Sequence, residues 1–171
     1  MMAVAKPVLA LRPMLPQDAP LLAEIFRASI EELTSDDYNS AQQQAWAEAA
    51  EDIEAFGERL GKQLTLIGTL TASPVGFISL QGADHIDMLY VHPAAAGQGV
   101  ATMLYDAIEK LAASRGAEKL TADVSDNAVE FFKRRKFVEQ RRNTVTRGNE
   151  WLANTTMEKR LGAKDQRDDK T

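Results

Sequence analysis

The residues best suited to chemistry lie between Leu89 and Thr102, in the segment LYVHPAAAGQGVAT. A β-rich run ends there, a loop with Gly97 and Gly99 follows, and a helical pattern begins at once. Glycines in such a loop let backbone N–H groups converge on a ligand, and the helix N-terminus adds unpaired donors and a positive dipole end. The segment therefore predicts an anion site, most readily for phosphate, to which the Thr102 hydroxyl can donate.

Two common phosphate-binding loops fit this segment poorly. A dinucleotide-binding turn has its first glycine directly after the first strand of a βαβ unit, with an acidic residue about twenty residues on. Here Pro93 and three alanines intervene, and several elements come before. The Gly-Lys-Ser/Thr of a Walker loop is absent from the sequence. A nucleotide binder of another kind remains an alternative.

The elements that must position this segment follow from periodicity and turn residues. Leu9 to Pro13 is a short strand, and Leu21 to Leu33 has the spacing of an amphipathic helix, with Asp18 at its N-cap and Pro20 in its first turn. Ser40 can cap a second helical region that runs through Trp46 to Leu60. The remaining expected elements are strands Gln63–Leu70, Val75–Gln81 and Ile86–Val91, helix Val100–Gly116, strand Leu120–Val124, helix Asn127–Lys136, and strands Phe137–Thr146 and Trp151–Lys159. This alternation predicts an α/β protein with a mixed sheet.

Composition narrows the possible classes. The 171 residues carry a net charge of -5, with 44% hydrophobic residues, two histidines and no cysteine. These counts exclude disulfides, Cys-ligated metals and a three-His zinc site, so no metal is expected. The acidic balance argues against nucleic acid as a partner, and no apolar run approaches the ~20 residues of a membrane span. We expect a cytoplasmic protein with one domain over residues 1–162 and a charged, disordered tail over 163–171.

The run Leu-Tyr-Val-His-Pro-x-x-x-Gly-x-Gly-Val-Ala-x-x-Leu resembles the acyl-CoA signature of the GNAT superfamily of N-acetyltransferases. Two further stretches are similar to that family. Leu120–Ala128, with the phenylalanines that follow it, resembles the next strand and helix. Arg142–Lys159 resembles the closing hairpin of a bacterial branch. The three regions occur in the family's order, and the resemblance covers nearly the whole chain, from Leu9 to Leu161.

This resemblance implies a mostly antiparallel sheet of six to seven strands with about four helices. Its central strands, Ile86–Val91 and Leu120–Val124, would splay apart around the pantetheine arm of acetyl-CoA. The implied cofactor-binding residues are Leu89, Tyr90, Val91, Gly97, Gln98, Gly99, Val100, Ala101, Thr102, Asn127, Phe131 and Phe132. The implied activity is direct acetyl transfer to a primary amine in a ternary complex. By analogy with the family, the closing hairpin could also support a homodimer.

Some positions depart from the family pattern. Phe132 stands where many members have a tyrosine whose hydroxyl protonates the leaving thiolate. Ala94 and Ala96 replace polar residues that contact CoA, and Lys136 replaces a usual glycine. These departures leave open an alternative function, a CoA-binding regulatory module with weakened catalysis.

Amine acetylation calls for a base, because an alkylamine must lose a proton before it attacks a thioester. Strict alternation along the strand would put His85, Asp87, Leu89 and Val91 on one face, and Ile86, Met88 and Tyr90 on the other. His85 lies where histone-acetylating relatives have a glutamate base, and Asp87 would share its face. An equal alternative is that both are solvent-facing polar residues at a strand end. Tyr90 and Tyr38 are the candidate acids.

Charge is unevenly divided along the chain. Ala28 to Glu58 contains nine acidic residues and no Lys or Arg. In the family this region forms one wall of the acceptor cleft, so Glu31, Asp36 and Tyr38 are predicted to bind a small cationic amine or a Lys-bearing peptide. A solvated helical face is the alternative for this region. The basic run Lys133–Lys136 is predicted to attract the 3′-phosphate of CoA, with a solvated face again as the alternative.

Overall fold

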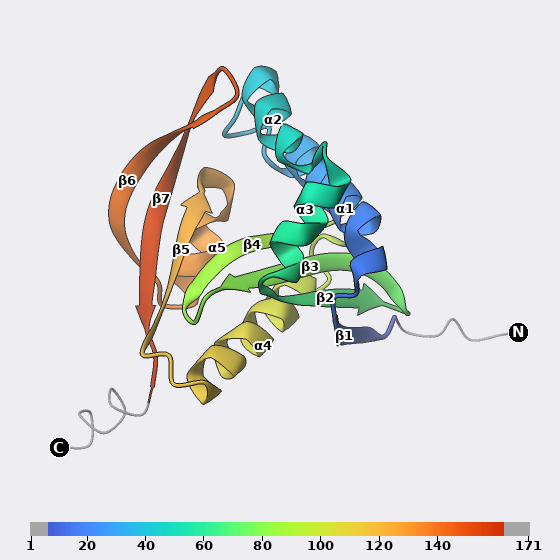
Figure 1. The fold of residues 1–171 in the computed structure, drawn as a ribbon. Helices are drawn as coiled ribbons and strands as arrows, with labels where there is room; N and C mark the ends of the chain where they lie inside the picture. Colours follow the sequence, from blue (N-terminus) through green and yellow to red (C-terminus); the bar gives the residue numbers. More distant parts are fainter. Residues whose placement is uncertain (1–6, 163–171) are drawn as a thin grey trace, which may run out of the picture.

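A computed structural model describes residues 7–162 (Figure 1). The predicted tail, 163–171, lies outside the described residues. The strands are β1 (Leu9–Pro13), β2 (Leu64–Leu70), β3 (Ser73–Gln81), β4 (His85–Val91), β5 (Lys119–Ser125), β6 (Val138–Arg147) and β7 (Glu150–Arg160). The helices are α1 (Ala19–Leu33), α2 (Ser40–Ala47), α3 (Ile53–Gly61), α4 (Val100–Ser114) and α5 (Val129–Arg134). Short 3-10 turns cover Pro16–Asp18, Glu48–Ala50, Pro93–Ala95 and Asp126–Ala128.

The seven strands form one sheet in the order β1-β2-β3-β4-β5-β7-β6. β4 and β5 run parallel and are paired at two positions, His85 with Thr121 and Ile86 with Ala122. The other neighbouring pairs are antiparallel. Past Ile86 the two central strands diverge, so β1–β4 and β5–β7 form two halves of the sheet (Figure 1). The predicted mixed, mostly antiparallel sheet with splayed central strands is confirmed.

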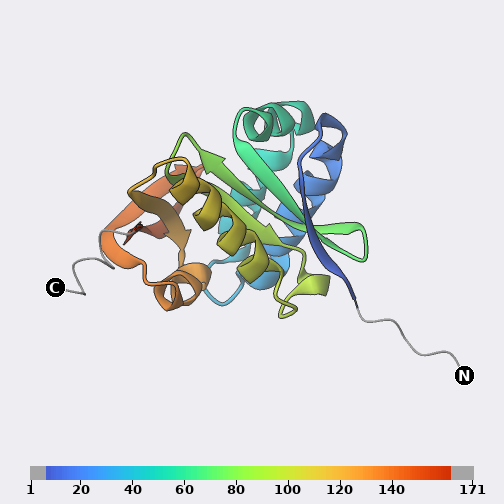
Figure 2. The same ribbon diagram turned by 90° about the horizontal axis from the view of Figure 1, so that it is seen from below.

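Two apolar cores hold the sheet from opposite faces. α1 and α3 bury Phe26 and Phe56 against Phe77 of β3 on one face. α4 crosses the other face, where its Leu104 and Tyr105 pack with Phe132 of α5 (Figure 2). Within residues 7–162, no helix has the length and apolar character that crossing a bilayer requires.

Asp18 stands at the N-cap position of α1 and Pro20 lies in the first turn, as predicted. The Asp18 side chain makes no cap hydrogen bond to the helix, because it accepts from the Leu15 N–H at 2.7 Å and from Arg12 at 2.8 Å. Two other predictions about helix ends are wrong, for local reasons. Asn39 rather than Ser40 caps α2, in a reciprocal capping box. The second helical region does not continue through to Leu60, because Asp52 takes an extended conformation and caps α3 through the Ala55 N–H. Residues 7–162 therefore contain five helices, where about four were expected.

β4 contains a β-bulge that changes which side chains share a face. Ser79 of β3 pairs with Met88 and Leu80 pairs with Ile86, so Asp87 is an extra residue without a partner on β3. The predicted alternation is therefore wrong. Ile86, Leu89 and Val91 pack with the α4-side core, whereas Met88 and Tyr90 pack with the core under α1 and α3. His85 and Asp87 line the same cavity as Met88 and Tyr90.

Candidate active site

The loop between β4 and α4 forms an exposed backbone cradle. Gly97 has φ 78° and Gly99 has φ 88°, a region that L side chains rarely adopt. The left-handed turn at Gly99 leads directly into α4, whose first hydrogen bond runs from the Met103 N–H to the Gly99 carbonyl. The N–H groups of the turn before Met103 have no intrahelical acceptor, so they are available to an anion at the positive end of the helix.

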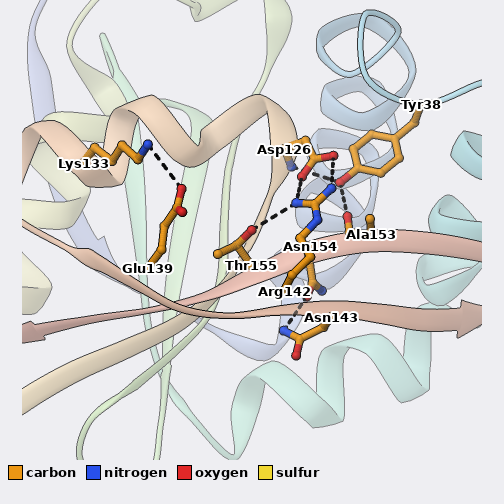
Figure 3. A network of polar contacts seen from close by, with 9 residues as sticks. All are labelled: Tyr38, Asp126, Lys133, Glu139, Arg142, Asn143, Ala153, Asn154 and Thr155. Atoms are coloured by element: carbon orange, nitrogen blue, oxygen red, sulfur yellow. Dashed lines mark hydrogen bonds and ion pairs between the residues drawn. The ribbon is translucent and has the colours of Figure 1, made fainter.

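A guanidinium lies beside this cradle. Arg135, which follows α5, donates from Nη2 to the Thr102 hydroxyl at 2.6 Å and from Nη1 to the Phe131 carbonyl at 2.9 Å. Its guanidinium carbon lies 3.5 Å from the centre of the Phe131 ring, which fixes its orientation. Of the basic run, Lys133 instead pairs with Glu139 at 3.2 Å (Figure 3). Arg135 is thus the member of the run that reaches the cradle.

The divergence of β4 and β5 leaves a narrow slot of about 90 Å³ between them. Its walls include Leu89 and Tyr90 from β4, Val124 and Ser125 from β5, and Phe132 from α5. Asn127 and Ala128, which follow β5, line it as well. Strands that separate also leave backbone groups without ladder partners, and such groups can bond to an extended amide chain.

A second cavity, of about 190 Å³, adjoins the slot. It is walled by α1–α3 on one side and by β6 and β7 on the other. Six residues line both the cavity and the slot: Trp46, Asp87, Met88, Tyr90, Asp123 and Ser125. A molecule in the cavity therefore meets the end of a chain lying in the slot.

His85 lies in the wall of this cavity and is half-buried. Its Nδ1 is 2.8 Å from the hydroxyl of Thr121, its partner on β5. Among the described residues no hydrogen bond occupies its Nε2. One ring nitrogen is thus fixed while the other is available, the arrangement of an imidazole that exchanges a proton with a substrate.

Asp87, predicted together with His85, is already engaged. Its two carboxylate oxygens accept from Arg59 at 2.8 and 3.1 Å and from Gln63 at 2.9 Å. These contacts leave little capacity to take a proton from an amine. Asp87 lies in the same cavity as His85, but its geometry is that of a carboxylate that holds Arg59 in place.

Tyr90 faces the junction of cavity and slot. Its ring packs against Phe26 at 4.7 Å between centroids and against Phe77 at 5.8 Å. Burial raises the pKa of its phenol well above the usual value, and the negative charge of Asp87 adds to this rise. The hydroxyl is therefore protonated at neutral pH, as any phenol is, and is a weaker acid than an ordinary phenol.

Tyr38 lines the cavity with its ring, which meets Trp46 at 5.4 Å between centroids. Its hydroxyl donates to the Ala153 carbonyl at 2.6 Å and accepts from the Asp126 N–H at 3.0 Å (Figure 3). Burial raises the pKa of this phenol too. Since both hydrogen bonds are internal, the hydroxyl is occupied by the fold rather than open to a substrate.

An ion pair between Arg142 and Asp126 adjoins the Tyr38 hydroxyl. Arg142 of β6 makes two hydrogen bonds to the Asp126 carboxylate, at 2.5 and 2.9 Å, and a third to Thr155 at 3.0 Å (Figure 3). Asp126 directly precedes Asn127 of the slot. The network therefore ties the slot wall to β6, β7 and the α1–α2 loop.

The comparisons with known proteins agree with this geometry. The sequence profile of the acetyltransferase (GNAT) domain matches residues 34–161. The chain belongs to the GNAT family of N-acetyltransferases. It is 32% identical over 142 residues to the uncharacterized N-acetyltransferase YafP of Escherichia coli K12, covering 83% of this chain and 89% of that protein.

Two solved GNAT structures show the same fold. A GCN5-related N-acetyltransferase from Rhodopseudomonas palustris is 60% identical with a TM-score of 0.88, covering 94% of this chain and 99% of that one. The PaiA N-acetyltransferase of Thermoplasma acidophilum, solved in complex with coenzyme A, has a TM-score of 0.70 at 20% identity, covering 90% and 99%. The expected family and fold are thus confirmed.

Set against this GNAT fold, the predicted cofactor residues fall into four places. The cradle holds Gly97 to Thr102, and the slot is lined by Leu89, Tyr90, Asn127 and Phe132. Val91 packs with the α4-side core and does not line the slot. Phe131 lies under Arg135, outside the slot lining. Phe132 is 4% exposed and packs against Phe137 at 5.0 Å between centroids. No phenol stands at that point of this GNAT site.

The structure does not bring Glu31 or Asp36 to the cavity, so these acceptor-residue predictions are not supported. Glu31 follows the fully buried Ile30 on α1, and one residue turns a helix by about 100°, so its carboxylate lies on an outer groove with Glu48 and Glu51. Asp36 is exposed in the α1–α2 loop and lines neither cavity nor slot.

Three charged residues that line the cavity escaped the sequence reasoning, namely Arg59, Asp123 and Arg147. Arg135, which reaches the cradle, belongs to the basic run that was predicted to attract a CoA phosphate. The basic run around Arg135 was a visible signal, although it could not distinguish one member from the others. Arg59, Asp123 and Arg147 lie on three distant elements and carry no local pattern. Across residues 7–162, no three His, Cys, Asp or Glu side chains gather as a metal site would require.

Proposed function

We propose that the protein transfers the acetyl group of acetyl-CoA directly to a primary amine, with both substrates bound at once. The observation that carries this proposal is the sharing of six lining residues between slot and cavity. A thioester at the end of a chain in the slot would face an amine in the cavity. The coenzyme A in the related PaiA structure supports CoA as the occupant of the cradle and slot.

Different residues of the chain would bind the cofactor and carry out the transfer. The N–H groups of Val100, Ala101 and Thr102 would hold the pyrophosphate, with Arg135 beside them. Leu89 and Val91 would offer backbone groups to the pantetheine and the thioester carbonyl. Phe132 closes the slot and excludes water there.

In the transfer step, the amine nitrogen attacks the thioester carbonyl carbon, a C–N bond forms and the C–S bond breaks. The proton lost by the amine passes to His85 Nε2, directly or through one water. The thiolate of CoA leaves and takes a proton from Tyr90 or from solvent. Because the chain contains no cysteine, no thiol acyl-enzyme intervenes, and transfer is direct.

A second candidate function is a CoA-binding regulatory module with weakened catalysis. Phe132 favours it, since this side chain lines the slot without offering a hydroxyl to the thiolate. Thiolate is a good leaving group, however, and Tyr90 offers a protonated phenol nearby. The two functions share the cofactor site and differ in turnover.

Thermal unfolding with CoA, acetyl-CoA and ATP, followed by thiol release with a panel of amines, separates the candidates. We expect CoA and acetyl-CoA to raise the melting temperature, ATP to have no comparable effect, and some amine to release thiol. The panel contains polyamines and Lys-bearing peptides, as the sequence predicts, together with amino acids. Absence of stabilisation by CoA would contradict both functions, and binding without thiol release would favour the regulatory module.

The base is tested with the two histidines of the chain. His85→Gln should lower kcat by about 10²- to 10⁴-fold, the usual contribution of a general base, and leave CoA binding intact. His92→Gln is the matched control, because His92 caps the 3-10 turn Pro93–Ala95 outside the cavity. A kcat of His85→Gln equal to that of the unmodified protein would rule out His85 as the base.

A further inference from the structure

The charged residues that line the cavity are not the acidic residues that the sequence predicted there. None of the nine acidic residues between Ala28 and Glu58 lines it. Its charged residues are Arg59, Arg147, Asp87 and Asp123, together with the titratable His85. Arg59 and Asp87 satisfy each other through two hydrogen bonds. The charges left for a substrate are therefore one cation, Arg147, and one anion, Asp123.

Arg147 is the last residue of β6, at the turn into β7. Its guanidinium donates to the Thr146 carbonyl at 3.0 Å, and no carboxylate of residues 7–162 lies within ion-pair distance of it. Glu48 approaches the neighbouring Gly148 but forms no ion pair with Arg147. The charge of Arg147 also reaches the Tyr90 phenol, where it opposes the rise in pKa caused by burial. Arg147 thus lines the cavity from the exposed turn between β6 and β7, with donors to spare.

Asp123 lies on β5, where the cavity meets the slot. Its carboxylate accepts one hydrogen bond, from the Thr156 hydroxyl at 2.6 Å, and Thr156 accepts in turn from Asn143 at 2.8 Å. These contacts orient the carboxylate without neutralising it, because no Lys or Arg of the described chain pairs with it. An ammonium bound here would lie beside the slot and in the same cavity as His85.

We propose that the acceptor is a zwitterion, a small primary amine that carries a carboxylate, as a free amino acid does. Its ammonium binds Asp123 at the mouth of the slot, and its carboxylate takes two hydrogen bonds from the planar guanidinium of Arg147. The cavity of about 190 Å³ has room for about six water molecules at ~30 Å³ each, which suits a small molecule. This inference rests on the proposed acetyl transfer and specifies its acceptor.

Matched acceptors test the inference. Each of several amino acids is compared with its amide and with the amine lacking the carboxyl group, for example lysine, lysinamide and cadaverine. We expect kcat/KM to be at least about tenfold higher for the free acid than for its amide or the amine without a carboxyl group. This is the factor that charge-assisted hydrogen bonds to the carboxylate should contribute. Arg147→Gln should remove this preference by raising KM for the acid alone, and Arg147→Lys should restore part of it. Asp123→Asn should raise KM for acids and amides alike.

Arg115→Gln is the control variant, since Arg115 lies at the far end of α4 and lines neither cavity nor slot. It removes the same charge and should leave the preference unchanged. An amide or diamine used as well as the free acid would overturn the inference, as would an Arg147→Gln variant that keeps the preference.

Calorimetry measures the binding of the same compounds to the protein–CoA complex. It tests the preference for the free acid without relying on turnover. Tighter binding of the acid than of its amide is expected, and equal or absent binding of both contradicts the zwitterion. Failure of the proposed function has another signature, the absence of CoA binding or of thiol release with every amine. The two failures are therefore distinguishable.

Discussion

The Tyr38 hydroxyl offers the sharpest test of how the site is held together. The β5–β7 ladder ends at Ser125 paired with Asn154, and the next pair in that register would be Asp126 with Ala153. The hydroxyl lies between these two residues, accepting from the Asp126 N–H and donating to the Ala153 carbonyl. It therefore bridges two backbone groups at the point where β5 leaves the sheet. Tyr38→Phe removes this oxygen and keeps the ring against Trp46.

The expected loss of stability follows from the two backbone groups that lose their hydrogen-bond partner. Tyr38 is 5% exposed, so water cannot readily replace its hydroxyl. A donor and an acceptor lose their partner, and a buried polar group without a partner costs about 1–3 kcal/mol. We expect Tyr38→Phe to lower the free energy of unfolding by about 2–3 kcal/mol. Because Asp126 precedes Asn127, the KM for acetyl-CoA should also rise.

Urea unfolding and steady-state kinetics measure the two effects. Tyr105→Phe is the matched control, because Tyr105 is 1% exposed and its hydroxyl donates to Glu109 at 3.1 Å. Glu109 keeps its ion pair with Lys159 in that variant, so only about 1 kcal/mol should be lost and neither KM should change. Equal stabilities of the two variants would refute the bridging role. A higher acceptor KM without loss of stability would instead support the predicted contact between the Tyr38 hydroxyl and the acceptor.

Three further substitutions test other contacts. Lys136 has a φ of 75°, which strains any residue with a Cβ. Lys136→Gly should therefore have a free energy of unfolding about 1 kcal/mol higher than Lys136→Ala, measured by urea unfolding. Equal values for the two variants would show that the backbone at this position is not strained. Arg135→Gln should weaken CoA binding by about tenfold in calorimetry, whereas Lys133→Gln, whose partner is Glu139, should have a smaller effect; the reverse order would remove Arg135 from the cradle. Hydrogen bonds from Arg12 hold the pKa of the Asp18 carboxyl below its ordinary value of 3.8, so the stability that this pair adds is present above pH 3.8 and is lost as the pH falls through the lowered pKa. Asp18→Asn should therefore cost about 1–2 kcal/mol at pH 7, and a pH series of urea curves should show the difference closing in acid; a gap that persists there would contradict the linkage.

The cradle and the strands beside it could be predicted from the sequence because their signals are local, whereas the divergence of β4 and β5 was implied only by the resemblance to the family. Gly97 and Gly99 mark positive φ angles directly, and the β-rich runs on either side of α4 are short and well bounded. Lys136 stands where similar proteins usually have glycine, and its φ of 75° accounts for that preference, although a lysine does not itself signal a left-handed conformation.

The charged lining of the cavity could not be predicted in the same way. Counting acids from Ala28 to Glu58 treats a stretch of chain as one surface, although a helix turns by about 100° per residue. The face of α1 toward the core is apolar, so Glu31 points outward. The residues that do line the cavity with charge, such as Asp123 and Arg147, meet only through pairing of β5, β6 and β7.

The β-bulge at Asp87 has the largest consequence for the chemistry. His85 and Tyr90 are five residues apart, and strict alternation places residues at odd separations on opposite faces of a strand. A base for the amine and an acid for the thiolate must nevertheless lie on the same side of the sheet, next to one thioester. The extra residue in β4 reverses the alternation after Asp87, so His85 and Tyr90 line the same cavity. Asp87 itself carries no sign of a bulge, being neither Gly nor Pro, and the anchor that holds it is Arg59, 28 residues away in the chain. The proposed pairing of acid and base therefore rests on a bulge that no local pattern in β4 signals.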